Sequence, residues 1–208
     1  MNYDILISFI IATSALAFSP GPDNIYVLMQ SISHGKTSGL ATVSGLISGC
    51  LVHTTLVAFG VSALIKENDS LFFIIKLFGA AYLLYLAYTV FKSDASLQLG
   101  SGSVPKKTGT QLFKQGFLMN VLNPKVSLFF LALFPGFLFS NTLNEVTQFY
   151  VLGFLFMAVS FIIFSSIALL AGSISTYITQ HKHIGSYLKW LQIFVFVGIA
   201  VFILFSKK

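Results

Sequence analysis

The chain has 208 residues, of which 56% are hydrophobic and only 9% are charged, whereas a soluble domain carries about 25% charged residues. This composition excludes a soluble globular protein and predicts an integral membrane protein, with room for about six helices of roughly 20 apolar residues each. The net charge of +6 comes from lysine alone and is too sparse to indicate a nucleic-acid partner. No pattern in the sequence predicts a cofactor, and a single cysteine, Cys50, excludes an internal disulfide.

Apolar segments follow one another along the chain and predict an all-α membrane protein with one transmembrane domain over residues 1–208. Their approximate bounds are 3–31, 38–65, 71–91, 112–139, 146–177 and 187–205. The stretch 92–111 is rich in Ser, Gly and Lys and is expected to be a flexible loop. Prolines interrupt the first and the fourth segments, so the chain is predicted to form two inverted three-helix repeats with broken helices 1 and 4.

Lysine positions orient these segments, because cytoplasmic loops of membrane proteins carry an excess of Lys and Arg. One side of the predicted membrane holds seven lysines, namely Lys36, Lys92, Lys106, Lys107, Lys114, Lys182 and Lys189. The other side holds four, namely Lys66, Lys76, Lys207 and Lys208. The loop 92–111 is therefore expected in the cytoplasm and both termini outside.

The first interruption consists of Pro20, Gly21 and Pro22, followed by Asp23 and Asn24. Backbone that cannot continue a helix is tolerated at membrane depth only where it is buried in protein or lines a water-filled cavity. An aspartate at the centre of a membrane helix costs roughly 2.5–3.5 kcal/mol to insert, so Asp23 is expected to face the interior. Two roles stay open for Asp23: it binds a proton or a substrate ammonium group, or it caps the helix that begins at Pro22.

The second interruption, around Asn120, Asn123, Pro124 and Lys125, occupies the corresponding place in the second half. Asn123 is expected to cap a helix beginning at Pro124, whose free backbone N–H groups would suit a carboxylate. Asn120 lies three residues earlier and would present its amide to the same cavity. Lys125 either faces this cavity or anchors the helix at the membrane interface. Because Asp23 and Lys125 occupy matching places, they are expected to pair until a zwitterion inserts between them.

Other candidate residues carry weaker signals. His53 and Tyr82 lie in apolar segments and could line a cavity, although an interior hydrogen bond for His53 and packing for Tyr82 are the simpler interpretations. Gly45 and Gly49 belong to a stripe of small residues that suits close packing within the chain or a homodimer equally well. The sequence lacks the clusters of Cys, His or carboxylates that predict a metal site.

Motifs follow one another in the first two thirds of the chain. They are Pro20-Gly21-Pro22-Asp23, then Gly79-Ala80-Ala81-Tyr82-Leu83-Leu84-Tyr85-Leu86, then Phe117-Leu118-x-Asn120-x2-Asn123-Pro124-Lys125 continuing to Phe129-Phe130-x-Ala132. In this order and spacing they make residues 1–140 resemble the LysE/RhtB family of amino-acid exporters. The resemblance implies a six-span exporter of the bacterial inner membrane, driven by the proton gradient and not an enzyme. Many members have Pro-Gln-Phe where this chain has Pro135-Gly136-Phe137, and this departure leaves the substrate open.

The residues and the resemblance together predict a secondary transporter that exports an amino acid or a close derivative by proton antiport. Its expected partners are the amino acid, protons and the lipid bilayer. Asp23 would bind the proton or the substrate ammonium group, and Asn123 with the helix start at Pro124 would bind the carboxylate. The residues expected to line the cavity with them are Asn24, Asn120 and Lys125.

Rival functions have less support in the sequence. An exporter of a metal or other inorganic ion would need ligands that the chain lacks. An intramembrane enzyme could be built on Ser44, Ser48 and His53, but packing explains the glycine spacing around these residues. A membrane scaffold without transport activity stays open as an alternative. It predicts that substitutions in the cavity have no effect, whereas packing substitutions at Gly45 or Gly49 are harmful.

Overall fold

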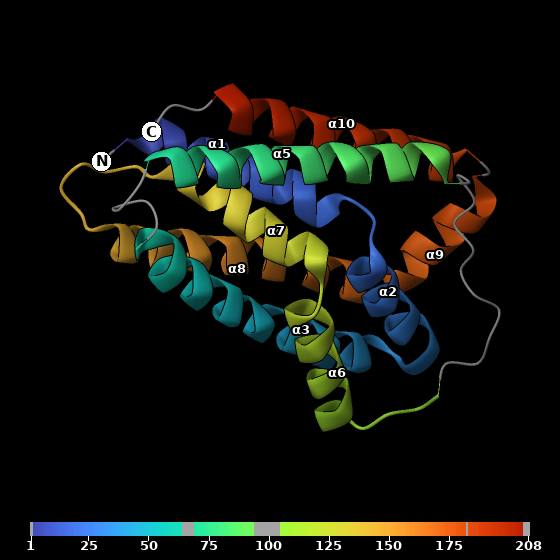
Figure 1. Ribbon diagram of the computed structural model, residues 1–208. Coiled ribbons are helices and arrows are strands. Elements are labelled where there is room, and N and C mark those ends of the chain that lie inside the picture. Colours follow the sequence, from blue (N-terminus) through green and yellow to red (C-terminus); the bar gives the residue numbers. More distant parts are fainter. Residues whose placement is uncertain (1, 64–68, 94–104, 182, 206–208) are drawn as a thin grey trace.

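The computed structural model describes residues 2–63, 69–93, 105–181 and 183–205. Every regular element in these ranges is a helix, which confirms the all-α prediction (Figure 1). In chain order they are α1 (Tyr3–Phe18), α2 (Pro22–His34), α3 (Lys36–Leu56), the π-helix η1 (Val57–Val61), α5 (Asp69–Lys92), α6 (Gly109–Val121), α7 (Pro124–Leu133), the 3₁₀ turn η2 (Phe134–Phe137), α8 (Glu145–Leu169), α9 (Ala171–Gln180) and α10 (Ile184–Phe205).

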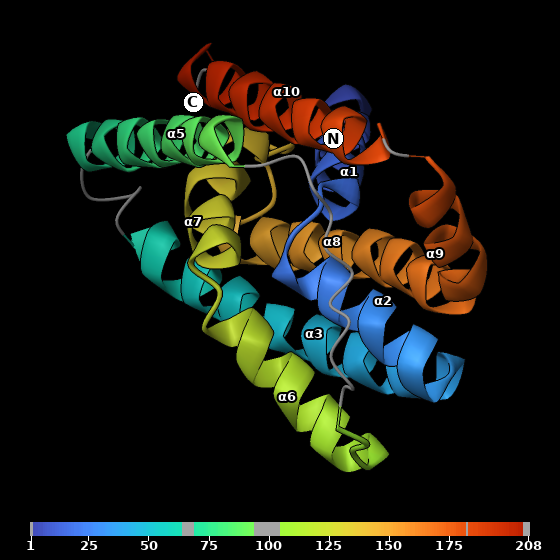
Figure 2. The ribbon, with the colours of Figure 1, turned by 90° about the vertical axis from the view of Figure 1, so that its right-hand side faces the viewer.

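The helices have the length and composition of a membrane protein. Among the described residues, α3 with η1, α8 and α10 are each long and apolar enough to cross a membrane. Two bent pairs, α1 with α2 and α6 with α7, pass the same test if each is one span, which gives up to five spans. α5 has 24 residues and a length of about 36 Å at 1.5 Å per residue, and it lies alongside α10 (Figures 1 and 2). The six-span inverted repeat stays a prediction.

The first break separates α1 from α2, whose axes differ by 58°. Pro22 is the first residue of α2, where its fixed φ suits the helix and its missing N–H would have no intrahelical partner. The Asn24 side chain donates a 2.8 Å hydrogen bond from Nδ2 to the carbonyl of Ala17, in the last turn of α1. The break therefore has a defined geometry. In it, Asn24 supplies a hydrogen-bond donor to a carbonyl group at the end of α1, where the last carbonyls of a helix have no partner within the helix.

The second break separates α6 from α7, with an angle of 52° between them. Asn123 caps α7 as predicted: its Oδ1 accepts a 3.0 Å hydrogen bond from the Lys125 N–H. Its backbone carbonyl accepts from the N–H of Val126 at 3.1 Å. The expectation of free amides at the start of α7 is therefore wrong. Pro124 has no N–H, and the N–H groups of Lys125 and Val126 already donate to Asn123.

Glycines bring α3 and α6 into direct backbone contact. A Cβ atom on Gly45 would overlap the backbone carbonyl of Phe113, and a Cβ on Gly116 would overlap the carbonyl of Thr42. The two helices are in contact and lie side by side in Figure 2. The glycine stripe is thus used for packing inside the molecule, and a homodimer needs a different surface.

The predicted fifth segment, 146–177, is not one helix. α8 ends at Leu169 and α9 begins at Ala171, after a turn at Leu170. A straight helix of 32 residues would measure about 48 Å, well beyond the roughly 30 Å of hydrocarbon. The sequence after Leu170 also turns polar, with Gly172 and Ser173, so the chain leaves the long helix where the apolar run ends.

A cluster of phenylalanine rings holds α1, α7 and α8 together. The ring of Phe130 stacks on that of Phe134 at 4.2 Å between centroids and meets the edge of Phe156 at 4.8 Å. Phe9 of α1 packs edge-on against Phe134 at 5.3 Å. These rings are almost fully buried, and such contacts add about 0.5–1.5 kcal/mol per pair beyond the burial itself. The cluster fixes the helices that carry both breaks against α8.

Candidate functional site

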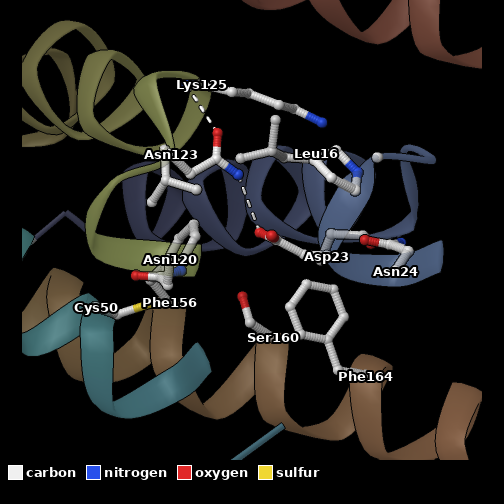
Figure 3. A pocket seen from close by; sticks show the side chains of 14 residues that line it. Leu16, Asp23, Asn24, Cys50, Asn120, Asn123, Lys125, Phe156, Ser160 and Phe164 are labelled. Carbon is white, nitrogen blue, oxygen red and sulfur yellow. Dashed lines mark hydrogen bonds between the residues drawn. The ribbon is translucent and has the colours of Figure 1, made fainter. Parts of the chain in front are cut away.

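The two breaks meet at one buried pocket. Its walls come from the end of α1, the start of α2, the break between α6 and α7, and the middle of α3 and α8 (Figure 3). The lining residues are Leu16, Ala17, Gly21, Pro22, Asp23, Asn24, Cys50, Asn120, Asn123, Lys125, Val126, Phe156, Ser160 and Phe164. Residues separated by about a hundred positions in the chain thus share one cavity.

Asp23 faces this pocket rather than capping α2. One carboxylate oxygen, Oδ2, accepts a 3.1 Å hydrogen bond from Asn123 Nδ2. The other oxygen, Oδ1, is buried and has no hydrogen-bond partner among the described residues. The start of α2 has no side-chain cap, so the capping role left open for Asp23 is not the one found. A buried carboxylate with a vacant acceptor position is suited to a proton or an ammonium group.

The hydrogen-bond partner of the Asp23 carboxylate is Asn123 and not Lys125, so the direct ion pair expected from the sequence is not formed. Asn123 Nδ2 donates to Asp23, and its Oδ1 accepts from the backbone N–H of Lys125. The Lys125 ammonium group instead lies 5.0 Å from the centroid of the Phe196 ring. It also approaches the first break, because a Cβ on Gly21 would lie only 3.5 Å from Lys125 Nζ. The single amide of Asn123 thus connects both breaks.

One corner of the pocket favours an anion. The first N–H groups of α2 have no side-chain cap, and a helix N-terminus carries a partial positive charge. The Lys125 ammonium group lies beside Gly21, the N-cap residue of that helix. The amides that suit a carboxylate therefore belong to the first break, whereas the sequence indicated the second.

Asn120 and His53 form the wall behind the pocket. Asn120 is buried and lines the pocket, and its side chain packs so closely on α3 that a Cβ on Gly49 would lie 2.7 Å from its Oδ1. The His53 ring donates from Nε2 to the Asn120 carbonyl at 3.1 Å. His53 is outside the lining of this pocket. Its hydrogen bond positions Asn120 at the end of α6.

Some of the remaining predicted residues line the pocket, whereas others lie outside its lining. Gly21, Pro22 and Asn24 line the pocket, while Pro20 and Pro124 only shape the breaks. Tyr82 on α5 packs beside Tyr85 at 6.2 Å between ring centroids and is not in the lining. Within the described part of the chain, no three His, Cys, Asp or Glu side chains are grouped so that they could hold a metal ion.

The sequence analysis missed the contribution of α8. Ser160 is buried, its hydroxyl points into the pocket and has no hydrogen-bond partner among the described residues (Figure 3). Phe156 and Phe164, one turn before and after it, line the same wall. The spacing of four residues puts all three on one face of the helix. The signal in the sequence is one serine in a long apolar run, which does not distinguish it from a packing residue.

A helical membrane protein whose two broken helices meet at a buried, charged pocket has the architecture of a membrane transporter. The chain belongs to the LysE type translocator family, whose model matches residues 14–207.

Curated relatives agree with this family. The homoserine/homoserine lactone efflux protein of Salmonella typhimurium is 29% identical over 199 residues, which cover 95% of this chain and 96% of the relative. The leucine efflux protein of Klebsiella pneumoniae is 26% identical over 200 residues, which cover 96% of this chain and 93% of the relative. No solved structure matches the chain. The family and these names support transport of amino acids out of the cell.

Proposed function

We propose that the protein exports an amino acid with an uncharged side chain across the bacterial cytoplasmic membrane, in exchange for protons. The observation that carries this proposal is the pocket where both helix breaks meet, with one carboxylate and one ammonium group in its lining. The lysine distribution supports cytoplasmic loops and external termini. In agreement with it, α1 begins and α10 ends at the same end of the bundle, opposite the α2–α3 turn (Figure 1).

The two ends of an amino-acid zwitterion fit two parts of this pocket. The substrate ammonium group binds Asp23 Oδ1, with the Ser160 hydroxyl as a second acceptor, because both oxygens are buried without a partner among the described residues. The carboxylate binds at the uncapped start of α2, next to Lys125 Nζ. Asn123 holds Asp23 in place through its other oxygen.

The charges of the lining restrict the substrate side chain. Among the described residues that line the pocket, only Asp23 and Lys125 are charged, and a zwitterion uses both. A basic or acidic side chain would then be buried without a counter-charge, which is strongly unfavourable. The rest of the wall includes Leu16, Phe156 and Phe164, which suits apolar carbon. The names of the relatives, with leucine and homoserine as transported molecules, support a side chain without charge.

The Asp23 carboxylate also supports coupling of this transport to protons. The Asp23 carboxylate can be neutralised by a bound proton or by the substrate ammonium group, but not by both at once. Binding of either one therefore displaces the other. Loading of the substrate from the cytoplasm releases a proton inward, and its departure outside allows a proton to bind. This alternation at one side chain gives antiport without a second titratable site.

Release of amino acids from cells tests this function. Cells that carry the gene or an empty vector are loaded with leucine, homoserine, lysine or glutamate, supplied as dipeptides, and the medium is assayed over time. We expect faster release of leucine or homoserine with the gene and no change for lysine and glutamate. Equal release with and without the gene, or equal stimulation for all four amino acids, would contradict the proposal.

A further inference from the structure

A seam between α2 and α8 leads away from the pocket. On α2 the buried residues Asp23, Val27 and Gln30 follow at intervals of four and three, which places them on one face. On α8 the residues Ser160 and Phe164 line the pocket and are followed by buried residues one turn on. The two helices are in contact, and Figure 2 shows α2 next to α8. Both faces therefore continue from the pocket toward the end of α2.

This seam ends at a contact between small residues of three helices. A Cβ on Gly39 of α3 would overlap the hydroxyl of Ser31 and lie 3.0 Å from the Cβ of Ala168. Ser31 follows Asp23 by eight residues, which is about 12 Å along α2, and Ala168 follows the lining residue Phe164 by four residues, which is about 6 Å along α8. α2, α3 and α8 thus touch with no space for a solute, on the side that the lysine distribution assigns to the cytoplasm.

Gln30 precedes Ser31 on α2, and its buried side chain has no hydrogen bond within the described part of the chain. Its side chain is 0% exposed, and neither Oε1 nor Nε2 has a partner among the described residues. Gln148, which is buried to a similar extent, makes four hydrogen bonds to the backbone of residues 139, 140 and 143. A buried amide without hydrogen-bond partners is unfavourable. Packing in the closed state does not explain why a glutamine occupies this position.

We propose that Gln30 lines the cytoplasmic entrance of the solute path, and that the Ser31–Gly39–Ala168 contact is the closure of this entrance. This inference rests on the proposed function, since it gives the path by which the amino acid reaches the pocket. When the contact opens, the Gln30 amide pairs with water or with the polar ends of the passing zwitterion. When it closes, the amide is buried behind Ser31, Gly39 and Ala168. These residues are small, so they can pack together without the rearrangement of a long side chain.

Replacement of Gln30 by leucine separates this role from a structural one. We expect Gln30→Leu to fold with a melting temperature no lower than that of the wild type, because the change removes two unpaired polar groups. We also expect it to bind leucine in detergent as the wild type does, since Gln30 lies outside the pocket lining, and to export at least tenfold more slowly. Ser62→Ala removes another buried polar group, a hydroxyl without a hydrogen-bond partner among the described residues. Ser62 follows η1, beyond the end of α3, and its replacement should leave export unchanged.

Reactivity of a cysteine at the same position tests the closure. In inside-out vesicles, Gln30→Cys should react with a water-soluble maleimide only slowly, and at least fivefold faster when Gly39→Ala is added, because the new methyl group prevents the contact. The wild type controls for Cys50, which is buried. Unchanged reactivity in the double variant would overturn the assigned closure.

Other outcomes also count against the inference. Wild-type export by Gln30→Leu, or loss of export together with a lower melting temperature, would show that the seam is not a path. If the wild type itself neither binds nor exports uncharged amino acids, the proposed function fails instead. The two failures are therefore distinguished by the wild-type binding measurement.

Discussion

Replacement of Asp23 by asparagine is expected to reduce amino-acid export by about 100-fold or more while the protein still inserts and folds. Asparagine has nearly the same shape, and its Oδ1 can still accept the hydrogen bond from Asn123 Nδ2. The change removes the one carboxylate among the described lining residues, so the substrate ammonium group is left buried without its counter-charge. Such a loss costs about 3–5 kcal/mol, and each 1.4 kcal/mol corresponds to a factor of ten.

The measurement is the release of preloaded leucine or homoserine, normalised to the amount of protein in the membrane. Asp4→Asn is the matched control, because Asp4 is an exposed acid in the first turn of α1 and is not part of the pocket. We expect normal release by Asp4→Asn. Release by Asp23→Asn at more than a third of the wild-type rate would mean that the carboxylate binds neither the ammonium group nor the transported proton.

Replacement of Gly45 by alanine is expected to cause the largest loss of stability for a single methyl group. The added Cβ would overlap the backbone carbonyl of Phe113, and a helix backbone cannot turn away as a side chain can. α3 and α6 would have to separate, which also displaces Asn120 from its contact with α3. Overpacking of this kind costs about 1–3 kcal/mol, occasionally more, and here we expect the upper end.

Thermal unfolding in detergent, followed by size-exclusion chromatography, measures this effect. Gly198→Ala in α10 is the control, because a Cβ at Gly198 meets nothing within 4 Å. The melting temperature should fall clearly for Gly45→Ala and stay unchanged for Gly198→Ala. Equal behaviour of the two variants would mean that α3 and α6 are not packed backbone to backbone.

The features that the sequence predicted well are local in the chain. Proline at the start of a helix and asparagine before it are strong signals within a few residues, so both breaks and the Asn123 cap are evident from residues 20–24 and 120–125. Glycines at intervals of four likewise indicate close packing, although the sequence cannot name the partner helix.

The features that it predicted poorly depend on contacts between distant segments. Asn123 bonds to Asp23 across a hundred residues, and no local pattern shows that this amide would replace an Asp23–Lys125 pair. Free backbone amides were expected at the start of α7, but the Asn123 side chain accepts a hydrogen bond from the Lys125 N–H there. The helix start without a side-chain cap is that of α2. Ser160 joins the site only because the phenylalanine cluster packs α8 against both breaks.

Competition for binding tests most directly whether the two breaks form a site for an amino acid. Radiolabelled leucine is bound to the purified protein in detergent and displaced by unlabelled leucine, N-acetyl-leucine or lysine. The assignment of the ammonium group to Asp23 predicts that leucine competes, that N-acetyl-leucine fails because its nitrogen has no charge, and that lysine fails because its side-chain charge has no partner. Competition by N-acetyl-leucine as strong as that by leucine, or leucine binding that survives Asp23→Asn, would contradict this account of the pocket.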